Sequence, residues 1–149
     1  MTIVPFSVIT YILDSPHIFP ANAMDWRFER VMAPEYIRIV TSGVYCSTGF
    51  EEMFDNLTSL EYWRFGTPLL LDHRKLDLIS TDPIELMAGS DNFVSRNPDF
   101  AFCRIAILFE TTESLEIAER YGEITDDRSL AEVQRFLKES DAIEWLVSY

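Results

Sequence analysis

The sequence predicts an α/β protein with a mixed, mainly parallel sheet, an antiparallel hairpin at its start and about four helices. Three observations carry this prediction. Strand-like runs alternate with segments of helical periodicity from residue 25 onward. The first two strand-like runs follow each other across a short turn, as in a hairpin. Each later pair of strands is separated by a helix, and strands joined in this way pair in parallel.

The composition is that of one acidic globular domain. The chain has 149 residues, of which 48% are hydrophobic and 25% are charged, and about 100–200 residues make one domain. Its formal net charge is −13, which repels nucleic-acid phosphates and argues against generic DNA or RNA binding. The cysteines are Cys46 and Cys103. Two are too few for a disulfide framework, so we expect a cytoplasmic protein with reduced thiols.

Residues 1–23 differ from the rest of the chain. They are largely apolar from Ile3 to Leu13, and they end in Ala21-Asn22-Ala23, which resembles a signal-peptidase site. However, no basic region precedes the apolar run, and the run is much shorter than the ~20 residues of a membrane helix. We therefore interpret residues 1–23 as an N-terminal extension, either upstream of a true start at Met24 or a loosely packed strand. The domain is expected to cover residues 24–149.

Two runs at the start of this domain predict the hairpin. Residues 25–32 read DWRFERVM, in which Trp26 and Phe28 share one face of a half-exposed strand. Residues 33–35 form a turn. Residues 36–44 read YIRIVTSGV, a run rich in the β-branched and aromatic residues that favour strands.

A helix is expected after the hairpin. Thr48 and Glu51 have the spacing of a capping box. Apolar residues then recur at steps of three and four on one helical face: Phe50, Met53, Phe54, Leu57, Leu60 and Trp63. Such a stripe is typical of core packed against a sheet, and the alternative is that it lines a lipid-sized pocket. The following apolar run at 69–71 predicts a strand covered on both faces.

The second half of the chain continues the alternation. Asp82 as the cap, Pro83 at the first helical position and Glu85 at the third predict a helix that runs to about Arg96. The elements expected after it are a strand at 102–109, a helix from Thr112 to near Gly122, a strand at 132–137 and a helix at 140–146.

Four features of these elements occur together in one known family. They are Gly43 at the strand end before the first helix, the strand LLLD at 69–72, the strand RIAIL at 104–108, and the ending VQRF at 133–136 followed by AIEWL at 142–146. With this element order, residues 25–149 resemble the STAS-like proteins, which include the bacterial SpoIIAA-like anti-sigma-factor antagonists, and within them an uncharacterised branch. The resemblance implies a STAS-like fold and a non-catalytic regulatory or protein-interaction module.

The resemblance also implies a candidate switch at Ser80 and Thr81. In phosphorylated members, Asp-Ser-Ser-Gly starts a helix shortly after a strand that ends in Asp. Here Asp72 is followed by HRKLDLI and then by Ser-Thr-Asp-Pro, so that Thr81 falls on the phosphorylated serine. A phosphate at this place would meet the positive end of a helix, although Pro83 removes an N–H donor and Asp82 would repel the phosphate. The alternative is that these side chains only cap the helix.

Four side chains form a candidate partner or ligand loop after the strand at 69–71: Asp72, His73, Asp77 and Asp82. Open α/β sheets bind ligands at the carboxyl ends of their strands. Asp72 and His73 with Asp77 are the residue types of a general-base pair or a metal corner. No recognisable nucleophile motif and no supporting histidine accompany them. We therefore expect a polar loop, with no catalytic residue, no metal and no cofactor.

The C-terminal part of the chain is strongly acidic. Residues 110–149 contain 11 Asp and Glu against 4 Lys and Arg. Glu113, Glu116 and Glu119 share one helix face, which is either a solvated surface or a surface that steers a basic partner.

Two functions follow. The favoured one is a non-catalytic regulatory module of STAS-like type that binds another protein and is switched at Ser80 and Thr81; a basic partner would suit its acidic surface. The alternative is a protein that binds a small, lipid-like apolar ligand, or an enzyme that acts on one through Asp72 and His73.

Overall fold

The computed structural model describes residues 9–11 and 24–148. The resemblance of residues 21–23 to a signal-peptidase site lies outside these residues. A short strand, β1 (Ile9–Tyr11), pairs with the edge of the domain. The interpretation of residues 1–23 as an extension remains a prediction.

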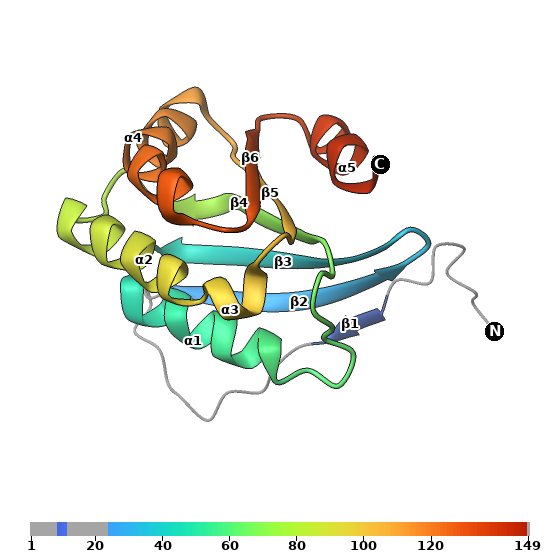
Figure 1. The fold of residues 1–149 in the computed structure, drawn as a ribbon. Coiled ribbons are helices and arrows are strands. Elements are labelled where there is room, and N and C mark those ends of the chain that lie inside the picture. Colours follow the sequence, from blue (N-terminus) through green and yellow to red (C-terminus); the bar gives the residue numbers. More distant parts are fainter. Residues whose placement is uncertain (1–8, 12–23, 149) are drawn as a thin grey trace.

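Within the described residues the sheet has six strands, arranged in the order in which they occur along the chain (Figure 1). Antiparallel pairing joins the first three strands, and parallel pairing joins the rest, as the alternation of strands and helices predicts. After β1 come β2 (Asp25–Met32), β3 (Glu35–Val44), β4 (Leu69–Asp77), β5 (Arg104–Leu108) and β6 (Glu132–Phe136).

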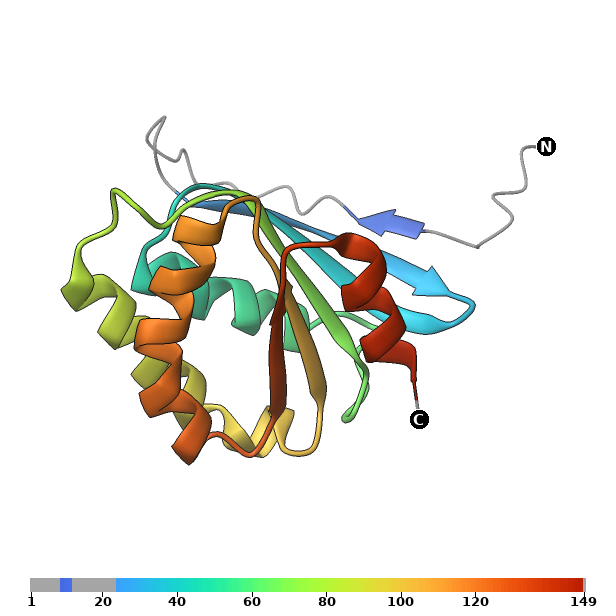
Figure 2. The same ribbon diagram turned by 90° about the horizontal axis from the view of Figure 1, so that it is seen from above.

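Helices cover the two faces of the sheet unequally. One face carries α1 (Ser47–Thr58), α2 (Pro83–Ser95) and α4 (Thr112–Arg128), and α5 (Glu139–Val147) lies on the other face (Figures 1 and 2). A single turn, α3 (Asn97–Phe100), links α2 to β5. The described residues therefore hold the four predicted helices and this additional turn.

Each face has its own core because side chains alternate across a strand. The larger core lies under α1, α2 and α4 and includes Phe28, Phe54 and Phe100, each at most 1% exposed. The smaller core lies under α5 and includes Leu70, Leu108 and Leu146, all fully buried.

The first helix begins and ends earlier than its sequence predicts. Its N-cap is Cys46, whose Sγ accepts a hydrogen bond from the Gly49 N–H at 3.3 Å, so the predicted capping box at Thr48 is wrong. The helix ends at Thr58, which leaves Leu60 and Trp63 beyond it. At this end the hydroxyl of Thr58 bonds back to the carbonyl of Phe54 at 3.0 Å, a side-chain bond of a kind that competes with the helical backbone pattern.

The fourth strand and the fourth helix are longer than expected. β4 continues through the polar run to Asp77 because β3 is long enough to pair with it up to Val44. α4 does not stop at Gly122 but runs to Arg128. A Cβ at Gly122 would lie 2.0 Å from Nη2 of Arg135, so this glycine makes room for a neighbouring side chain and does not end the helix.

Candidate functional site

The structure separates Asp72 from His73. Both lie inside β4 and not in a loop, and the alternation of the strand sends them to opposite faces of the sheet. A β-bulge marks the place. Between the pairs Val40–Asp72 and Ser42–Lys75, β4 has two residues opposite Thr41 alone. The two side chains therefore belong to different surroundings and cannot act as one dyad.

Asp72 is the centre of an ion-pair network on the α5 face. Its Oδ2 accepts hydrogen bonds from Arg38 Nη2 at 2.6 Å and from Arg74 Nη2 at 2.8 Å. Both arginines also contact Glu139, the first residue of α5, with Arg38 Nη1 2.5 Å from its Oε1. Burial alone would raise the pKa of Asp72, but the bonds from Arg74 and Arg38 outweigh burial and lower the pKa to about 2. Such a carboxylate is a weak base at neutral pH, and its observed contacts fasten α5 to the sheet.

His73 faces the larger core. It is 6% exposed, and its Nδ1 lies 2.6 Å from the hydroxyl of Thr41, which is fully buried. The rings of Phe50 and Phe109 lie on either side of it, with centroids 6.4 Å and 6.0 Å away. Burial lowers the pKa of His73 to about 4, although the charge of Asp72 acts in the opposite direction. The imidazole is therefore neutral at physiological pH.

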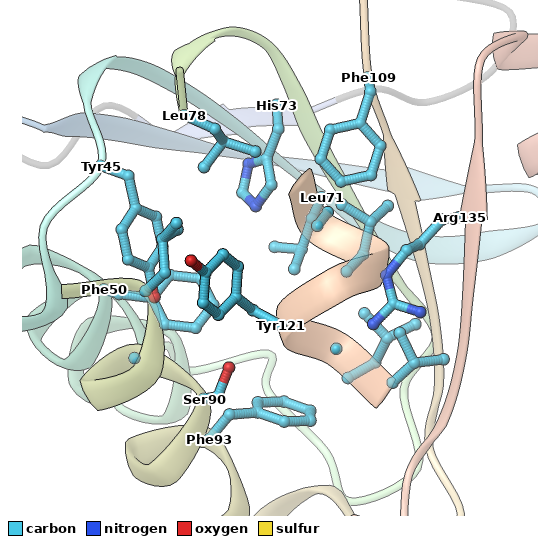
Figure 3. A pocket seen from close by; sticks show the side chains of 17 residues that line it. Tyr45, Phe50, Leu71, His73, Leu78, Ser90, Phe93, Phe109, Tyr121 and Arg135 are labelled. Atoms are coloured by element: carbon cyan, nitrogen blue, oxygen red, sulfur yellow. The ribbon is translucent and has the colours of Figure 1, made fainter. Parts of the chain in front are cut away.

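The side chain of His73 points into a cavity of about 110 Å³ between the sheet and helices α2 and α4 (Figure 3). Most of the wall is apolar. The polar side chains that reach it come from five different elements or their ends: Tyr45, His73, Ser90, Tyr121 and Arg135. Of the predicted apolar stripe, only Phe50 lines this cavity, and the other members pack in or against the core.

Two glycines allow the polar side chains to approach the helices. A Cβ at Gly89 would lie 1.5 Å from the hydroxyl oxygen of Tyr45, and Gly122 makes the same room for Arg135. Sequence reasoning missed Tyr45, Tyr121 and Arg135. The available signal was Gly89 in the middle of a helix, a position where glycine costs about 1 kcal/mol relative to alanine and therefore indicates a close approach.

The candidate switch residues occupy the tight turn between β4 and α2. The hydroxyl of Thr81 donates to the carbonyl of Asp77 at 2.9 Å and is part of a residue that is 8% exposed, whereas Ser80 is exposed. The N–H of Ser80 donates to Asp77 Oδ1 at 2.9 Å and lowers the pKa of that carboxyl. Asp82 is the N-cap of α2, with its Oδ1 2.9 Å from the Ile84 N–H, as predicted.

The same turn is bordered by an exposed apolar surface. Ile79 is 52% exposed, Ile84 71% and Met87 53%. Ile84 and Met87 are three residues apart on α2 and so share its outer face. We call these three residues the α2 patch. The acidic residues Asp77, Asp82 and Glu85 lie within the same segment.

Glu85 connects this segment to the first helix. Its Oε1 accepts from the Ser47 N–H at 3.2 Å and its Oε2 from the Ser47 hydroxyl at 3.1 Å. A side chain of α2 thus satisfies a backbone donor at the start of α1. The helix that carries Ile84 and Met87 of the α2 patch is therefore held to α1 by these hydrogen bonds.

Solved structures that are similar to most of the chain include one whose description names its fold. It is a crystal structure of an uncharacterized protein of the DUF3478 family from Shewanella loihica PV-4, described as having a SpoIIAA-like fold. The similarity covers 87% of this chain and 98% of that one, with a TM-score of 0.57 and 17% sequence identity. The chain has a SpoIIAA-like fold. No family model and no curated protein matches it.

The SpoIIAA-like fold confirms the architecture that the STAS-like resemblance implies. It does not by itself assign an activity, because one fold hosts many functions. Within the described residues of this SpoIIAA-like domain, no helix is long and apolar enough to cross a membrane. No group of three His, Cys, Asp or Glu side chains in that part of the chain has the arrangement of a metal site.

Proposed function

We propose that the protein is a non-catalytic interaction module that binds a partner protein on the α2 patch. The observation that carries this proposal is the exposure of Ile79, Ile84 and Met87 on both sides of the candidate switch. Large apolar side chains that gather on a rigid, exposed helix start are typical of protein-binding surfaces.

The charge around the patch indicates the chemistry of the partner. Asp77, Asp82 and Glu85 lie in the same segment of the chain, which carries a formal net charge of −13. A partner with an apolar strip flanked by Lys or Arg complements this surface, and we expect the complex to weaken as salt is added.

The turn gives this module a means of regulation at Ser80 and Thr81. A phosphate on Thr81 would replace the proton that its hydroxyl donates to the Asp77 carbonyl, and would add about −1.5 to −2 charges beside two carboxylates. That carbonyl also accepts the Tyr45 N–H at 3.1 Å, so the turn would detach from the end of β3 and the α2 patch would lose its shape. Modification of Thr81 therefore acts as an off switch in this proposal.

Site-specific photo-crosslinking in lysate of the source cells tests the docking surface. A photoreactive residue at position 84 is expected to give a discrete protein adduct that disappears in the Met87→Asp background. The matched control places the same residue at position 27, where Arg27 has a 48% exposed side chain on the opposite face of the sheet. The same adducts from both positions, or no adduct at 84, would contradict the proposal.

The switch is tested with the same crosslinker. Thr81→Glu is expected to reduce the adduct at position 84 at least fivefold. Two further variants separate the effect of the lost hydrogen bond from the effect of the added charge. Thr81→Val removes the hydroxyl without adding charge, and Ser80→Glu adds charge at the exposed neighbour. Unchanged crosslinking in Thr81→Glu would remove the regulatory part of the proposal and leave the docking surface standing.

A further inference from the structure

The cavity beneath α2 and α4 contains hydrogen-bonding atoms that the fold itself does not use. His73 is 94% buried, and its Nδ1 is bound to Thr41, but its Nε2 has no hydrogen-bond partner among the described residues. The same holds for the hydroxyl of Tyr45, a residue that is 8% exposed. The imidazole of His73 points into the cavity, and Tyr45 lies along its wall with the hydroxyl against α2 (Figure 3). Neither atom is sealed inside the protein, so each can be reached from the cavity, where a bound molecule that bonds to both would replace water.

The charge states of His73 and Tyr45 indicate which polar group a bound molecule would place beside them. His73 is neutral at pH 7, and burial raises the pKa of Tyr45 so that its O–H is retained. Neither therefore offers a charge to pair with. A hydroxyl both donates and accepts, so it matches Nε2 in either tautomer of His73 and matches the Tyr45 hydroxyl as well.

The side chains of the cavity wall and the cavity volume indicate the polarity and the size of the rest of the bound molecule. The rings of Phe50, Phe93 and Phe109 and the side chains of Leu71, Ile105 and Val133 line the space. Its volume is about 110 Å³. An engineered apolar cavity of about 150 Å³ in another protein holds benzene, whereas pockets for drug-sized ligands start at about 300 Å³. At about 110 Å³ the cavity is smaller than that benzene site, so it takes at most one ring, part of which faces its open side, and it is too small for a lipid chain.

We propose that this cavity binds a small aromatic alcohol of the phenol class, with the ring among the apolar side chains and the hydroxyl at His73 and Tyr45. The inference is independent of the α2 patch on the outer face of the same helix. α2 supplies Leu86, Gly89 and Phe93 to the cavity wall.

Titration of the full chain with phenol and with toluene, followed by two-dimensional NMR, tests this site. The two probes have the same shape, but only phenol has a hydroxyl. Phenol is expected to shift resonances of residues that line the cavity and to bind at least tenfold more tightly than toluene. The absence of cavity shifts with both probes would overturn the proposal. Equal affinities for phenol and toluene would overturn the part of the proposal that concerns the hydroxyl, because His73 and Tyr45 would then make no hydrogen bond that favours phenol.

Two variants place the binding inside the cavity. His73→Leu is expected to abolish the preference for phenol while toluene still binds. Ala118→Leu adds bulk to the cavity wall on α4 and is expected to eliminate binding of both probes, whereas Glu119→Leu, at the exposed neighbouring position, leaves it unchanged. Binding that survives Ala118→Leu would overturn the assignment. If His73→Leu does not fold, the phenol and toluene comparison in the unaltered chain together with Ala118→Leu still decides the question.

The docking surface and the cavity can fail separately. Met87→Asp, on the outer face of α2, is expected to abolish crosslinking at position 84 and to leave phenol binding intact. Ala118→Leu is expected to have the reverse effect.

Discussion

Asp72 and His73 are neighbours in the chain, yet they lie on opposite faces of the sheet and differ in charge and in contacts. Asp72 is charged and holds two arginines and the start of α5, whereas His73 is neutral and faces the cavity. The bulge opposite Thr41 lets one hydroxyl contact both neighbours, with its Oγ1 3.1 Å from the Asp72 carbonyl oxygen and 2.6 Å from His73 Nδ1. Each residue therefore has a consequence for stability that the other lacks.

His73 makes stability fall as the solution becomes mildly acidic. Its pKa is about 4 in the folded protein and 6.5 as a free side chain. Above pH 6.5 it contributes no pH dependence. Below that value the unfolded chain binds a proton that the folded chain excludes, so stability is lost as the pH falls toward 4. From pH 7.5 to pH 5 we expect a loss of about 2 kcal/mol from this residue. Urea unfolding of His73→Gln at the two pH values should show a smaller loss by that amount, and an unchanged loss would contradict the buried neutral state.

Asp72 stabilises the protein through its buried pairing. Its side chain is 6% exposed, and removing its charge takes from Arg38 and Arg74 one of the two carboxylates with which both of them pair. We expect Asp72→Asn to lower the free energy of unfolding by about 2–3 kcal/mol, which is below the range for fully buried pairs because Arg74 is 35% exposed. The matched control is Asp91→Asn, which breaks the exposed pair with Arg128 and should cost less than about 1 kcal/mol. Equal costs in urea denaturation would rule out a special role for Asp72.

At the scale of elements, α2 contributes to the proposed docking surface, to the start of α1 and to the cavity. Its outer face carries the α2 patch, its start caps α1 through Glu85, and its inner face lines the cavity. Gly89 lies where α2 and Tyr45 approach each other closely. Glycine is needed here because a larger side chain would collide with the Tyr45 hydroxyl.

Replacing Gly89 by alanine is expected to destabilise the protein even though alanine is the better helix former. The added Cβ would lie 1.5 Å from the hydroxyl oxygen of Tyr45, so the ring or the helix must move. We expect a net loss of about 2 kcal/mol, as for other overpacked cores, against a gain of about 1 kcal/mol at an unobstructed position. Circular dichroism melts of Gly89→Ala and of the exposed control Asp91→Ala would check this. Stabilisation by Gly89→Ala would mean that Tyr45 does not occupy this space.

At the scale of the whole molecule, the architecture was predictable because it depends on local signals. The alternation within β2, the continuous apolar run of β4 and the Asp82 cap of α2 each act within a few residues of sequence. The cavity was not predictable in the same way. Its polar side chains come from positions as distant as Tyr45 and Arg135, and only the folded sheet brings them to one space. Pairing with distant strands also decided where β4 ends, which is why the predicted loop at Asp72 and His73 was wrong.

The last helix shows how a small element completes the molecule. Arg38 and Arg74 hold the start of α5 through Glu139, and Arg104 Nη1 holds its end through the carbonyl of Trp145 at 2.7 Å. Beneath α5 lie Val31, Tyr36, Leu70, Ala106 and Leu108, all buried. Removal of α5 would expose this apolar surface on an otherwise formed sheet.

Shortening the chain from its two ends is therefore expected to have opposite results. As far as the described residues go, a chain of residues 24–149 loses the pairing of the three-residue β1 at the edge of the sheet, and we expect its free energy of unfolding to change by no more than about 1 kcal/mol. A chain of residues 1–137 lacks α5, and we expect it to aggregate or to bind the dye ANS, because an apolar face of this kind is not stable in water. Size-exclusion chromatography, ANS fluorescence and urea unfolding compare the two directly. Unfolding of the 24–149 chain would show that residues 1–23 belong to the domain, and a monomeric, dye-free 1–137 chain would show that the smaller core does not need its helix.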